Sequence, residues 1–245
     1  MRIVTWNING LRSIMSKGSL EKLLSGRYEV VLLQEIRSSG EVPLTIMNMG
    51  YLAYPFPARR KGYSGVMTLT LTKPISVIKG LGIGEFDEEG RVITIELNNL
   101  YIVNAYFPRA GDDLGRLDFK IRFCQAIERF LEGLRARKPV VICGDFNIAR
   151  DRIDSSFWDE KHPGLTPEER AWFRDFLSRG YVDVLRELHP GLRVYTWRSY
   201  REREKAMRLD YCVVSSELMP RVRYVGVLEH VEGSDHKPVM LQLDL

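Results

Sequence analysis

Several polar residues that could bind a metal ion or a phosphate stand where short apolar runs end. The run Val30–Leu33 passes directly into Gln34 and Glu35, and an earlier extended run ends in Asn7 and Asn9. A carboxylate that follows four apolar residues is either a metal ligand or the first solvated residue of a loop. Glu35 alone therefore favours the loop interpretation, and a functional role needs partners elsewhere in the chain.

A second acidic position follows the apolar run 140–143, in the order Gly144, Asp145, Phe146, Asn147. Gly144 permits a close approach of another backbone segment, because it has no side chain. Asp145 and Asn147 would lie on the same face if the segment is extended, since side chains alternate along a strand. Asp and Asn also form turns after strands, so the pattern is compatible with a purely structural role.

Near the end of the chain, Asp235 and His236 precede the apolar run 239–243. Adjacent residues of an extended segment point in opposite directions, so these two side chains cannot simply pair with each other. Asp210 lies inside another predicted strand, where a buried acid is costly unless it has a partner. We therefore predict that His236 pairs with Asp210, the alternative being a histidine that only packs in the core.

These residues have in common that they occur at or inside predicted strands and offer oxygen or imidazole ligands without any thiol: Asn7, Glu35, Tyr106, Asp145, Asn147, Asp210, Asp235 and His236. Such a carboxylate-rich set suits Mg²⁺, a hard cation that prefers oxygen ligands. We interpret their recurrence at strand ends as a common site at one edge of a sheet.

Ten short β-branched or apolar runs predict the strands that would position this site: 2–8, 30–35, 66–72, 91–97, 100–107, 140–146, 195–199, 209–215, 224–229 and 239–243. Apolar residues at three- and four-residue steps predict a helix over 114–138. A second helix is predicted to start at Thr166, with Pro167 at its first position and Glu169 completing a capping box, and to end at Gly180. The pattern favours mixed sheets packed face to face, with helices outside, in one domain over residues 1–245.

Composition gives only weak guidance about function. Lys and Arg number 36 against 32 Asp and Glu, a net charge of +4, which many proteins that never bind nucleic acid share. The odd number of cysteines and their wide spacing indicate neither a disulfide framework nor a zinc cluster. No apolar stretch reaches membrane-spanning length and no secretory h-region is apparent, so we expect no membrane association and a cytoplasmic protein.

The ordered motifs TWNINGLR, LLQE, GYSG, FDEEGRV, NAYFP, GDFN, TPEER, YTWRSY, RLDY and GSDHKP cover essentially the whole chain, which resembles the exonuclease III-type AP endonucleases. GDFN and SDH are shared across the wider endonuclease/exonuclease/phosphatase superfamily, which includes pancreatic-type deoxyribonucleases, sphingomyelinases and inositol phosphatases. WNING, GYSG and RLDY discriminate better for the repair enzymes.

The resemblance implies an α/β fold, a four-layer sandwich of two packed mixed β-sheets flanked by helices. It implies a DNA repair nuclease that hydrolyses the phosphodiester 5′ to abasic sites and leaves a 3′-OH, with 3′–5′ exonuclease and 3′-end phosphodiesterase or phosphatase activity. The cofactor would be Mg²⁺, with Mn²⁺ as a substitute, and Glu35 would be its main ligand, with Asn7 and Asp235 near the ion or its waters. The number of metal ions and the recognition of uracil stay open.

The resemblance also assigns catalytic roles. Asp145 would orient or deprotonate the attacking water, and Asn147 would hold that water or a phosphate oxygen. His236, oriented by Asp210, would bind the scissile phosphate, and Tyr106 would stabilise the phosphate or the leaving group.

The implied partner is double-stranded DNA with abasic sites or damaged 3′ ends, bound by a monomer. Phosphate contacts are expected from loop residues beside the strand ends: Arg12, Arg59, Arg60, Lys61, Tyr63, Arg109, Arg198, Arg201, Arg203 and Lys205. Trp197, Met207 and Leu209 occupy the positions of the pocket that receives an abasic deoxyribose. Met207 departs from the tryptophan usual in the family, and Arg109 stands where an asparagine is common.

Two other functions are compatible with parts of the pattern. A phosphoesterase with the same metal site could act on a lipid or inositol substrate instead of DNA, and a decayed nuclease could only bind nucleic acid. The repair-type motifs argue against the first, and the presence of every expected acid argues against the second.

Overall fold

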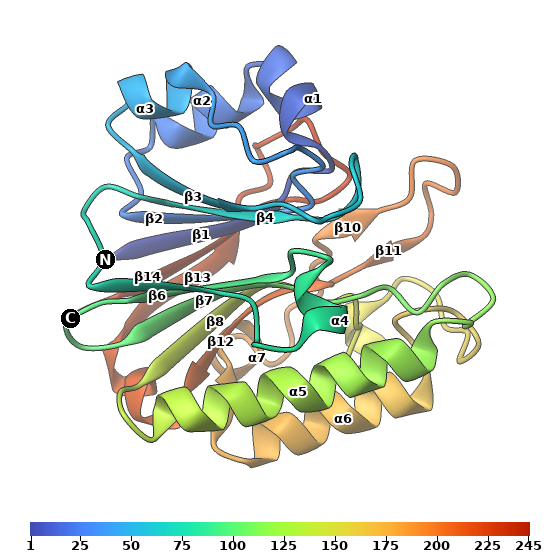
Figure 1. Cartoon of the computed structure of the whole chain (residues 1–245). Helices are drawn as coiled ribbons and strands as arrows, with labels where there is room; N and C mark the ends of the chain where they lie inside the picture. Colours follow the sequence, from blue (N-terminus) through green and yellow to red (C-terminus); the bar gives the residue numbers. More distant parts are fainter.

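Two mixed six-stranded sheets lie face to face at the centre of the computed structural model, which describes residues 1–245 (Figure 1). The first sheet has the order β13 (Val222–Val227), β14 (Val239–Leu243), β1 (Arg2–Asn7), β2 (Val30–Gln34), β4 (Val66–Thr70), β3 (Leu52–Phe56). The second has the order β5 (Ser76–Lys79), β6 (Val92–Glu96), β7 (Tyr101–Tyr106), β8 (Val140–Asp145), β12 (Asp210–Ser215), β9 (Tyr181–Asp183). Only the pairs β1/β2 and β7/β8 are parallel.

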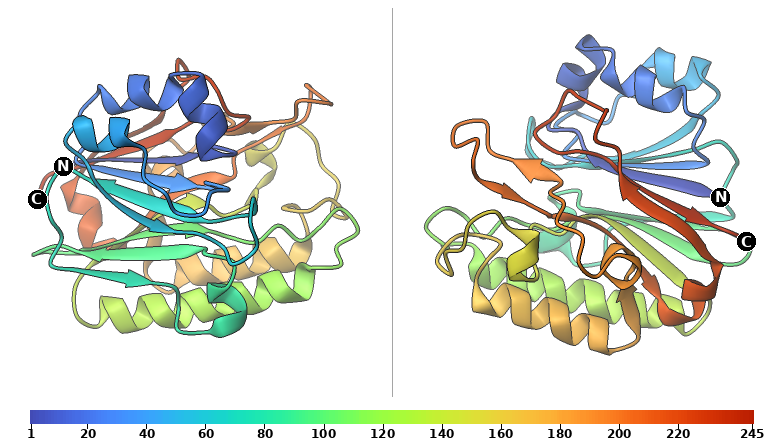
Figure 2. Two further views of the ribbon diagram at one scale, coloured as in Figure 1. Left: turned by 45° about the horizontal axis from the view of Figure 1, so that its top comes forward. Right: turned by 180° about the vertical axis from the view of Figure 1, so that it is seen from behind.

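Helices cover the outer face of each sheet, which makes four layers (Figures 1 and 2). The first sheet carries α1 (Leu11–Ser16), α2 (Ser19–Leu24) and α3 (Leu44–Asn48), and the second carries α5 (Leu117–Arg135) and α6 (Pro167–Ser178). The remaining elements are α4 (Gly84–Asp87), α7 (Val184–Leu188), the 3₁₀ turns η1 (Arg152–Asp154) and η2 (Ser216–Arg221), and the small hairpin of β10 (Trp197–Arg198) and β11 (Ala206–Met207). The expected four-layer α/β sandwich is confirmed.

The central strands are apolar on both faces because each contributes to two cores. In β1, Ile3 packs between the sheets while Val4 and Trp6 pack under the helices of the first layer. In β8, Val141 packs between the sheets and Ile142 packs under α5 and α6. Odd positions of β1 and β8 therefore face the opposite sheet, and this parity continues to the strand ends where the polar residues stand.

All ten predicted runs contain strands, but four strands were missed. The edge strand β3 contains Pro55, which breaks the strand pattern and is tolerated only where one side of the backbone is unpaired. The others, β5, β9 and β11, are short. Short helices α1 to α4 and α7 were also missed, because segments of four to six residues carry too little periodicity to stand out.

The two predicted helices are confirmed with adjusted ends. The first begins at Leu117 instead of Leu114, which adopts a left-handed conformation with φ 59° in the preceding turn. The second has the expected capping box: Thr166 Oγ1 accepts a hydrogen bond from the backbone N–H of Glu169, whose carboxylate accepts from the N–H of Thr166. The three cysteines are buried and unpaired.

Candidate active site

A pocket of about 270 Å³ opens where the inner faces of the two sheets end, and most of the predicted chemistry lines it. Its lining includes predicted residues from across the chain, namely Asn7, Glu35, Tyr106, Arg109, Asp145, Asn147, Trp197, Met207, Leu209, Asp235 and His236. Strand parity explains the convergence. Asn7 ends β1, Asp145 ends β8 and Asp210 begins β12, and each occupies a position that faces the opposite sheet.

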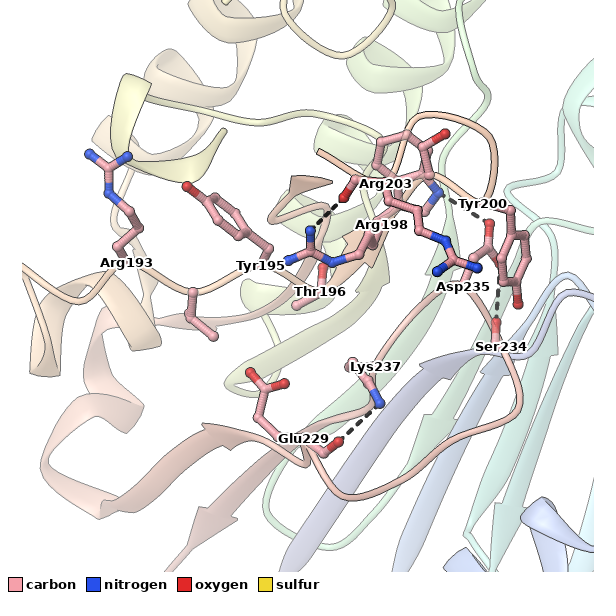
Figure 3. A pocket seen from close by; sticks show the side chains of 13 residues that line it. Arg193, Tyr195, Thr196, Arg198, Tyr200, Arg203, Glu229, Ser234, Asp235 and Lys237 are labelled. Carbon is pink, nitrogen blue, oxygen red and sulfur yellow. Dashed lines mark hydrogen bonds between the residues drawn. The ribbon is translucent and has the colours of Figure 1, made fainter. Parts of the chain in front are cut away.

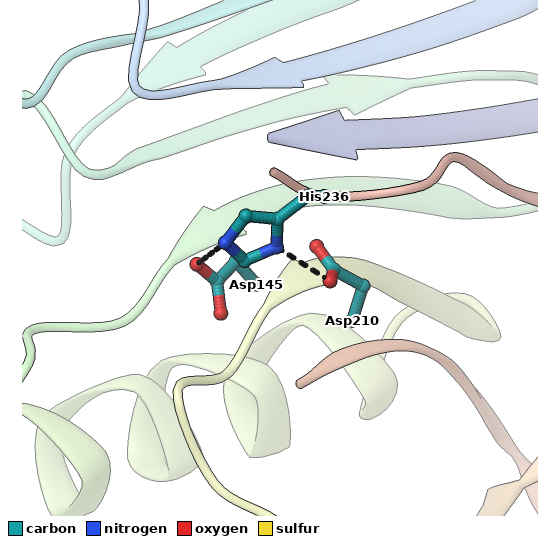
Figure 4. A group of neighbouring side chains, drawn as sticks. All are labelled: Asp145, Asp210 and His236. Carbon is teal, nitrogen blue, oxygen red and sulfur yellow. Dashed lines mark hydrogen bonds and ion pairs between the residues drawn. The ribbon is translucent and has the colours of Figure 1, made fainter. Parts of the chain in front are cut away.

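Asp145, Asp210 and His236 form the buried floor of the site (Figure 4). His236 Nδ1 lies 2.8 Å from Asp210 Oδ2, and His236 Nε2 lies 3.9 Å from Asp145 Oδ2. The predicted pair of Asp210 and His236 is confirmed. His236 is held in place through its backbone, because Trp6 Nε1 donates to its carbonyl oxygen at 2.9 Å.

Burial and mutual charge shift the pKa values of this group. Burial raises the pKa of Asp145 to about 7, against the opposing effect of His236 and with a further increase from the neighbouring Asp210. For His236, burial opposes the charged form, but the carboxylates of Asp210 and Asp145 outweigh it and raise the pKa to about 10. At neutral pH His236 is therefore a cation, and Asp145 can readily gain or lose a proton.

Asp145 and Asn147 come together by a turn and not by extended alternation, so that part of the prediction is wrong. Asn147 has a left-handed φ of 52°, and its backbone N–H donates to Asp145 Oδ1 at 2.8 Å. Its side-chain amide donates to the carbonyl oxygen of Phe107 at 3.0 Å. The expected need for glycine is confirmed, since a Cβ on Gly144 would lie 1.8 Å from the carbonyl oxygen of Ala105.

Asn7 connects two carboxylates of the pocket. Its Nδ2 donates to Asp145 Oδ2 at 2.9 Å and to Glu35 Oε2 at 3.1 Å. Glu35 has a positive φ of 56°, a conformation that costs about 1–3 kcal/mol for a residue with a side chain and that is typical of functional sites. The opposite oxygen of Glu35 accepts a hydrogen bond from Arg37 Nε at 3.0 Å.

Asp235 forms a separate wall of the pocket and, as expected, does not pair with His236. Its two carboxylate oxygens accept hydrogen bonds from Asn9 Nδ2 at 2.9 Å and from Trp197 Nε1 at 3.1 Å. Burial raises its pKa, but the His236 charge and these hydrogen bonds outweigh burial, so the net shift is downward. Asp235 therefore remains ionised throughout the neutral range.

Tyr106 presents an uncommitted hydroxyl group. The phenol forms no hydrogen bond within the chain, and the guanidinium of Arg91 lies 4.8 Å from the ring centroid. Burial, followed by the negative charge of Glu35, raises its pKa well above the ordinary value. Tyr106 therefore stays protonated and can donate a hydrogen bond to a ligand.

The pocket contains groups able to hold a metal ion. Ligand atoms of Asp145, Asp210 and His236 lie within 4.8 Å of one another, and the carboxylates of Glu35 and Asp235 line the same cavity. The donors are carboxylate and amide oxygens and the imidazoles of His162 and His236, and no thiol is among them.

The chain matches the Endonuclease/Exonuclease/phosphatase family over residues 4–236. It belongs to that family. An exodeoxyribonuclease of Bacillus subtilis is 35% identical over 254 residues, with both chains covered completely. A DNA-(apurinic or apyrimidinic site) endonuclease of Dictyostelium discoideum is 39% identical over 256 residues, which cover this whole chain and 71% of the relative.

Solved structures agree with this family membership. An AP endonuclease from Archaeoglobus fulgidus superposes with a TM-score of 0.90 at 26% identity, with both chains fully covered. A variant of the Neisseria 3′ phosphatase NExo, bound to a product DNA hairpin, superposes with a TM-score of 0.88 at 28% identity, again over both whole chains. No helix of this family member has the length and apolar character needed to span a membrane.

The residues predicted to bind DNA lie in four places in this family member. Trp197, Met207 and Leu209 line the active-site pocket, and Met207 and Leu209 are only 3% and 4% exposed. Arg12 and Lys61 line a larger hollow beside α1, whereas Arg60 and Tyr63 line one near Arg116. Arg198 faces a hollow on the outer side of Trp197.

Three polar or charged pocket residues were not predicted. Asn9 was noticed only as a polar strand-end residue, yet it holds Asp235 in place. Arg37 stands two residues after Glu35, and that spacing next to an acid was the available signal. His162 lies in an irregular segment between η1 and α6, where no periodic pattern could indicate that it reaches the pocket.

Proposed function

We propose that the chain is a metal-dependent DNA repair nuclease that hydrolyses the phosphodiester 5′ to abasic sites and leaves a 3′-OH. We also propose 3′–5′ exonuclease and 3′-end phosphodiesterase or phosphatase activity. The observation that carries the proposal is the placement of cationic His236 against Asp145 at the floor of one pocket, with Asp210 on the other imidazole nitrogen. Relatives that align over the whole chain are named AP endonuclease and exodeoxyribonuclease.

The pKa values of Asp145 and His236 support different roles for the two residues. A general base works best with a pKa near the working pH, and Asp145, at about 7, fits the deprotonation of the attacking water. His236 is protonated at that pH and cannot act as a base, so it would bind the non-bridging oxygens of the phosphate. Asp210 would keep the imidazole oriented and charged.

Tyr106 and Asn147 complete the arrangement. Tyr106 keeps its proton and has a free hydroxyl, so it would donate to the phosphate or to the departing oxygen. Asn147 donates from its backbone N–H to Asp145 Oδ1 and from its side-chain amide to Asp145 Oδ2. It would therefore orient Asp145 and hold the attacking water in line with the scissile bond.

The donor set of the pocket fits Mg²⁺. Glu35 would be its principal ligand, with Asn7 and Asp235 contacting the ion or its water molecules, and Mn²⁺ would substitute. When bound, the ion would neutralise charge that develops on the phosphate oxygens. Arg37 engages Glu35 on one oxygen and would share that carboxylate with the cation.

Double-stranded DNA is the proposed partner, bound by a monomer. Phosphate contacts would come from Arg12 in α1, from Arg198 in β10, and from the loop residues Arg60, Lys61, Tyr63 and Arg109. Trp197, Met207 and Leu209 would form the wall against which an abasic deoxyribose packs. We expect the flexible Met207 to accept more varied sugars than a rigid indole would.

The test is a panel of matched duplexes carrying an abasic analogue, a recessed 3′ end, a 3′-phosphate or uracil, incubated with the protein and Mg²⁺. We expect incision 5′ to the abasic analogue with a 3′-OH product, and removal of the 3′-phosphate. If all four duplexes stay intact while a phosphoinositide is hydrolysed, the proposal of a DNA substrate is wrong.

A further inference from the structure

A hollow of about 520 Å³ lies on the outer side of the active-site wall, between the β10/β11 hairpin and the segment that leads into β14 (Figure 3). Trp197 and Asp235 line both this hollow and the active-site pocket. The side chains of Trp197 and Asp235 therefore form a common wall between the two spaces. We call this second space the outer hollow.

The outer hollow carries unneutralised positive charge. The guanidinium groups of Arg193 and Arg203 form no hydrogen bond or ion pair within the chain, although both are exposed at its rim. Arg198 and Lys237 donate only to backbone carbonyl oxygens, those of Arg203 and of Glu229 and Val231. Elsewhere many exposed arginines are paired with acids, for example Arg59 with Glu88.

The two acids of the outer hollow do not cancel this charge. Both carboxylate oxygens of Asp235 accept hydrogen bonds, one from Asn9 and the other from Trp197, and neither is paired with an arginine of the outer hollow. Glu229 is a single carboxylate beside Lys237. Four cations thus face two acids, and the surplus predicts an anionic ligand.

Tyrosine rings accompany the free guanidinium groups. Figure 3 shows Arg193 and Tyr195 toward one end of the outer hollow, and Arg203 and Tyr200 toward the other. Tyr200 is 66% exposed. Tyr195 is half-buried, so Tyr200 offers the more accessible ring. Aromatic rings beside cations suit a single nucleic-acid strand, because bases stack on the rings while phosphates contact the guanidinium groups.

We propose that the outer hollow is a second nucleic-acid subsite that holds a short unpaired segment of the strand whose phosphodiester lies in the active site. The segment must be unpaired, since a base inside a duplex is stacked on both faces and cannot lie on Tyr200. The inference rests on the proposed function and extends its substrate class from fully paired duplex to DNA with a single-stranded segment next to the cleavage point.

The test compares binding in excess chelator, where no cleavage occurs. Fluorescence anisotropy measures the affinity for an abasic-analogue duplex that is fully paired, for the same duplex with an unpaired thymidine segment beside the analogue, and for hexathymidylate alone. The test variant is Arg193→Ala/Arg203→Ala. The matched control is Arg129→Ala/Arg137→Ala, which removes the same charge from exposed, unpaired arginines in and just after α5.

We expect the test variant to lose about tenfold in affinity for the partly unpaired duplex and for hexathymidylate. The loss on the fully paired duplex should be much smaller, about twofold, because only Arg203 is also expected to contact a duplex phosphate. Its salt slope should fall by about 1.4, because each phosphate contact with a single strand contributes about 0.7. Tyr200→Ala should produce a similar loss, unlike Tyr224→Ala, which truncates an exposed tyrosine on β13.

Equal losses on paired and partly unpaired DNA, or equal losses in the test and control variants, would show general electrostatic attraction and overturn the subsite. Unchanged affinity for hexathymidylate would overturn it as well. The proposed nuclease function fails separately, if the unmodified protein with Mg²⁺ leaves the paired abasic duplex uncut, because the hexathymidylate measurement does not depend on cleavage.

Discussion

Lys120 Nζ lies 2.6 Å from the carbonyl oxygen of Asn147 and 2.5 Å from Glu169 Oε1. Lys120 and Glu169 are completely buried, and Glu169 Oε2 accepts hydrogen bonds from the N–H groups of Gly164 and Thr166. A buried ion pair between α5 and α6 thus holds Asn147, the left-handed residue two positions after Asp145. The turn at Asp145–Asn147 therefore depends on α5 and α6 as well as on its own sequence.

Lys120→Met is expected to lower the free energy of unfolding by about 3–5 kcal/mol, because Glu169 is left as an uncompensated buried charge. The measurement is urea denaturation followed by circular dichroism. Lys120→Met/Glu169→Leu removes both charges and should recover part of the loss. A single variant within about 1 kcal/mol of the parent would contradict the importance of this pair.

Asp145→Asn is expected to reduce cleavage of an abasic duplex by at least about 10²-fold while leaving DNA affinity within twofold, because the amide keeps the shape but cannot accept the proton. Single-turnover kinetics and anisotropy in chelator measure the two quantities. Undiminished cleavage by the variant would remove Asp145 from the role of base.

The pH dependence of cleavage follows from the same residue. Asp145 must be ionised to act as a base, so the rate should fall as the pH drops through the pKa of this carboxyl, which lies at about 7. A bound cation stabilises the carboxylate and moves this acidic limb below 7. Rates measured from pH 5 to 8 at saturating DNA would show the limb, and a flat profile would argue against a titrating base.

His236 should make the free energy of unfolding decrease as the pH rises above neutrality. Its pKa is raised from the ordinary 6.5 to about 10, so the folded state retains a proton that the unfolded state loses. The resulting stabilisation is fully present below pH 6.5 and is lost as the pH rises through 10. His236→Gln should show a shallower decline in unfolding free energy between pH 6.5 and 10, and an equal decline in both proteins would contradict the shift.

Removal of divalent metal is expected to abolish cleavage, and added Mg²⁺ or Mn²⁺ should restore it. Because Glu35, Asp145 and Asp235 crowd negative charge into one pocket, Mg²⁺ should also raise the melting temperature of the parent protein. Glu35→Gln should lose most of that rise, whereas Glu41→Gln, an exposed acid after the same strand, should retain it. Full activity in excess chelator would eliminate the metal from the mechanism.

Much of the site could be predicted from sequence because its signals are local. Apolar runs that end in Asp145 or Glu35 place acids at strand ends, and a buried Asp210 requires a partner that His236 can supply. The capping box at Thr166 was equally visible, since capping depends on residues three positions apart.

Only the tertiary structure determines which side chains from distant parts of the sequence meet in the site. Asn7 reaches Asp145 across 138 positions of sequence, and only the packing of the two sheets brings their inner faces to one edge. Residue types alone do not indicate that Asn147 adopts a left-handed backbone conformation or that Lys120 donates a hydrogen bond to its carbonyl oxygen. Nor do they indicate that Trp197 separates two hollows. Periodicity determines which face a side chain occupies, but the partner that it meets there is set by long-range packing.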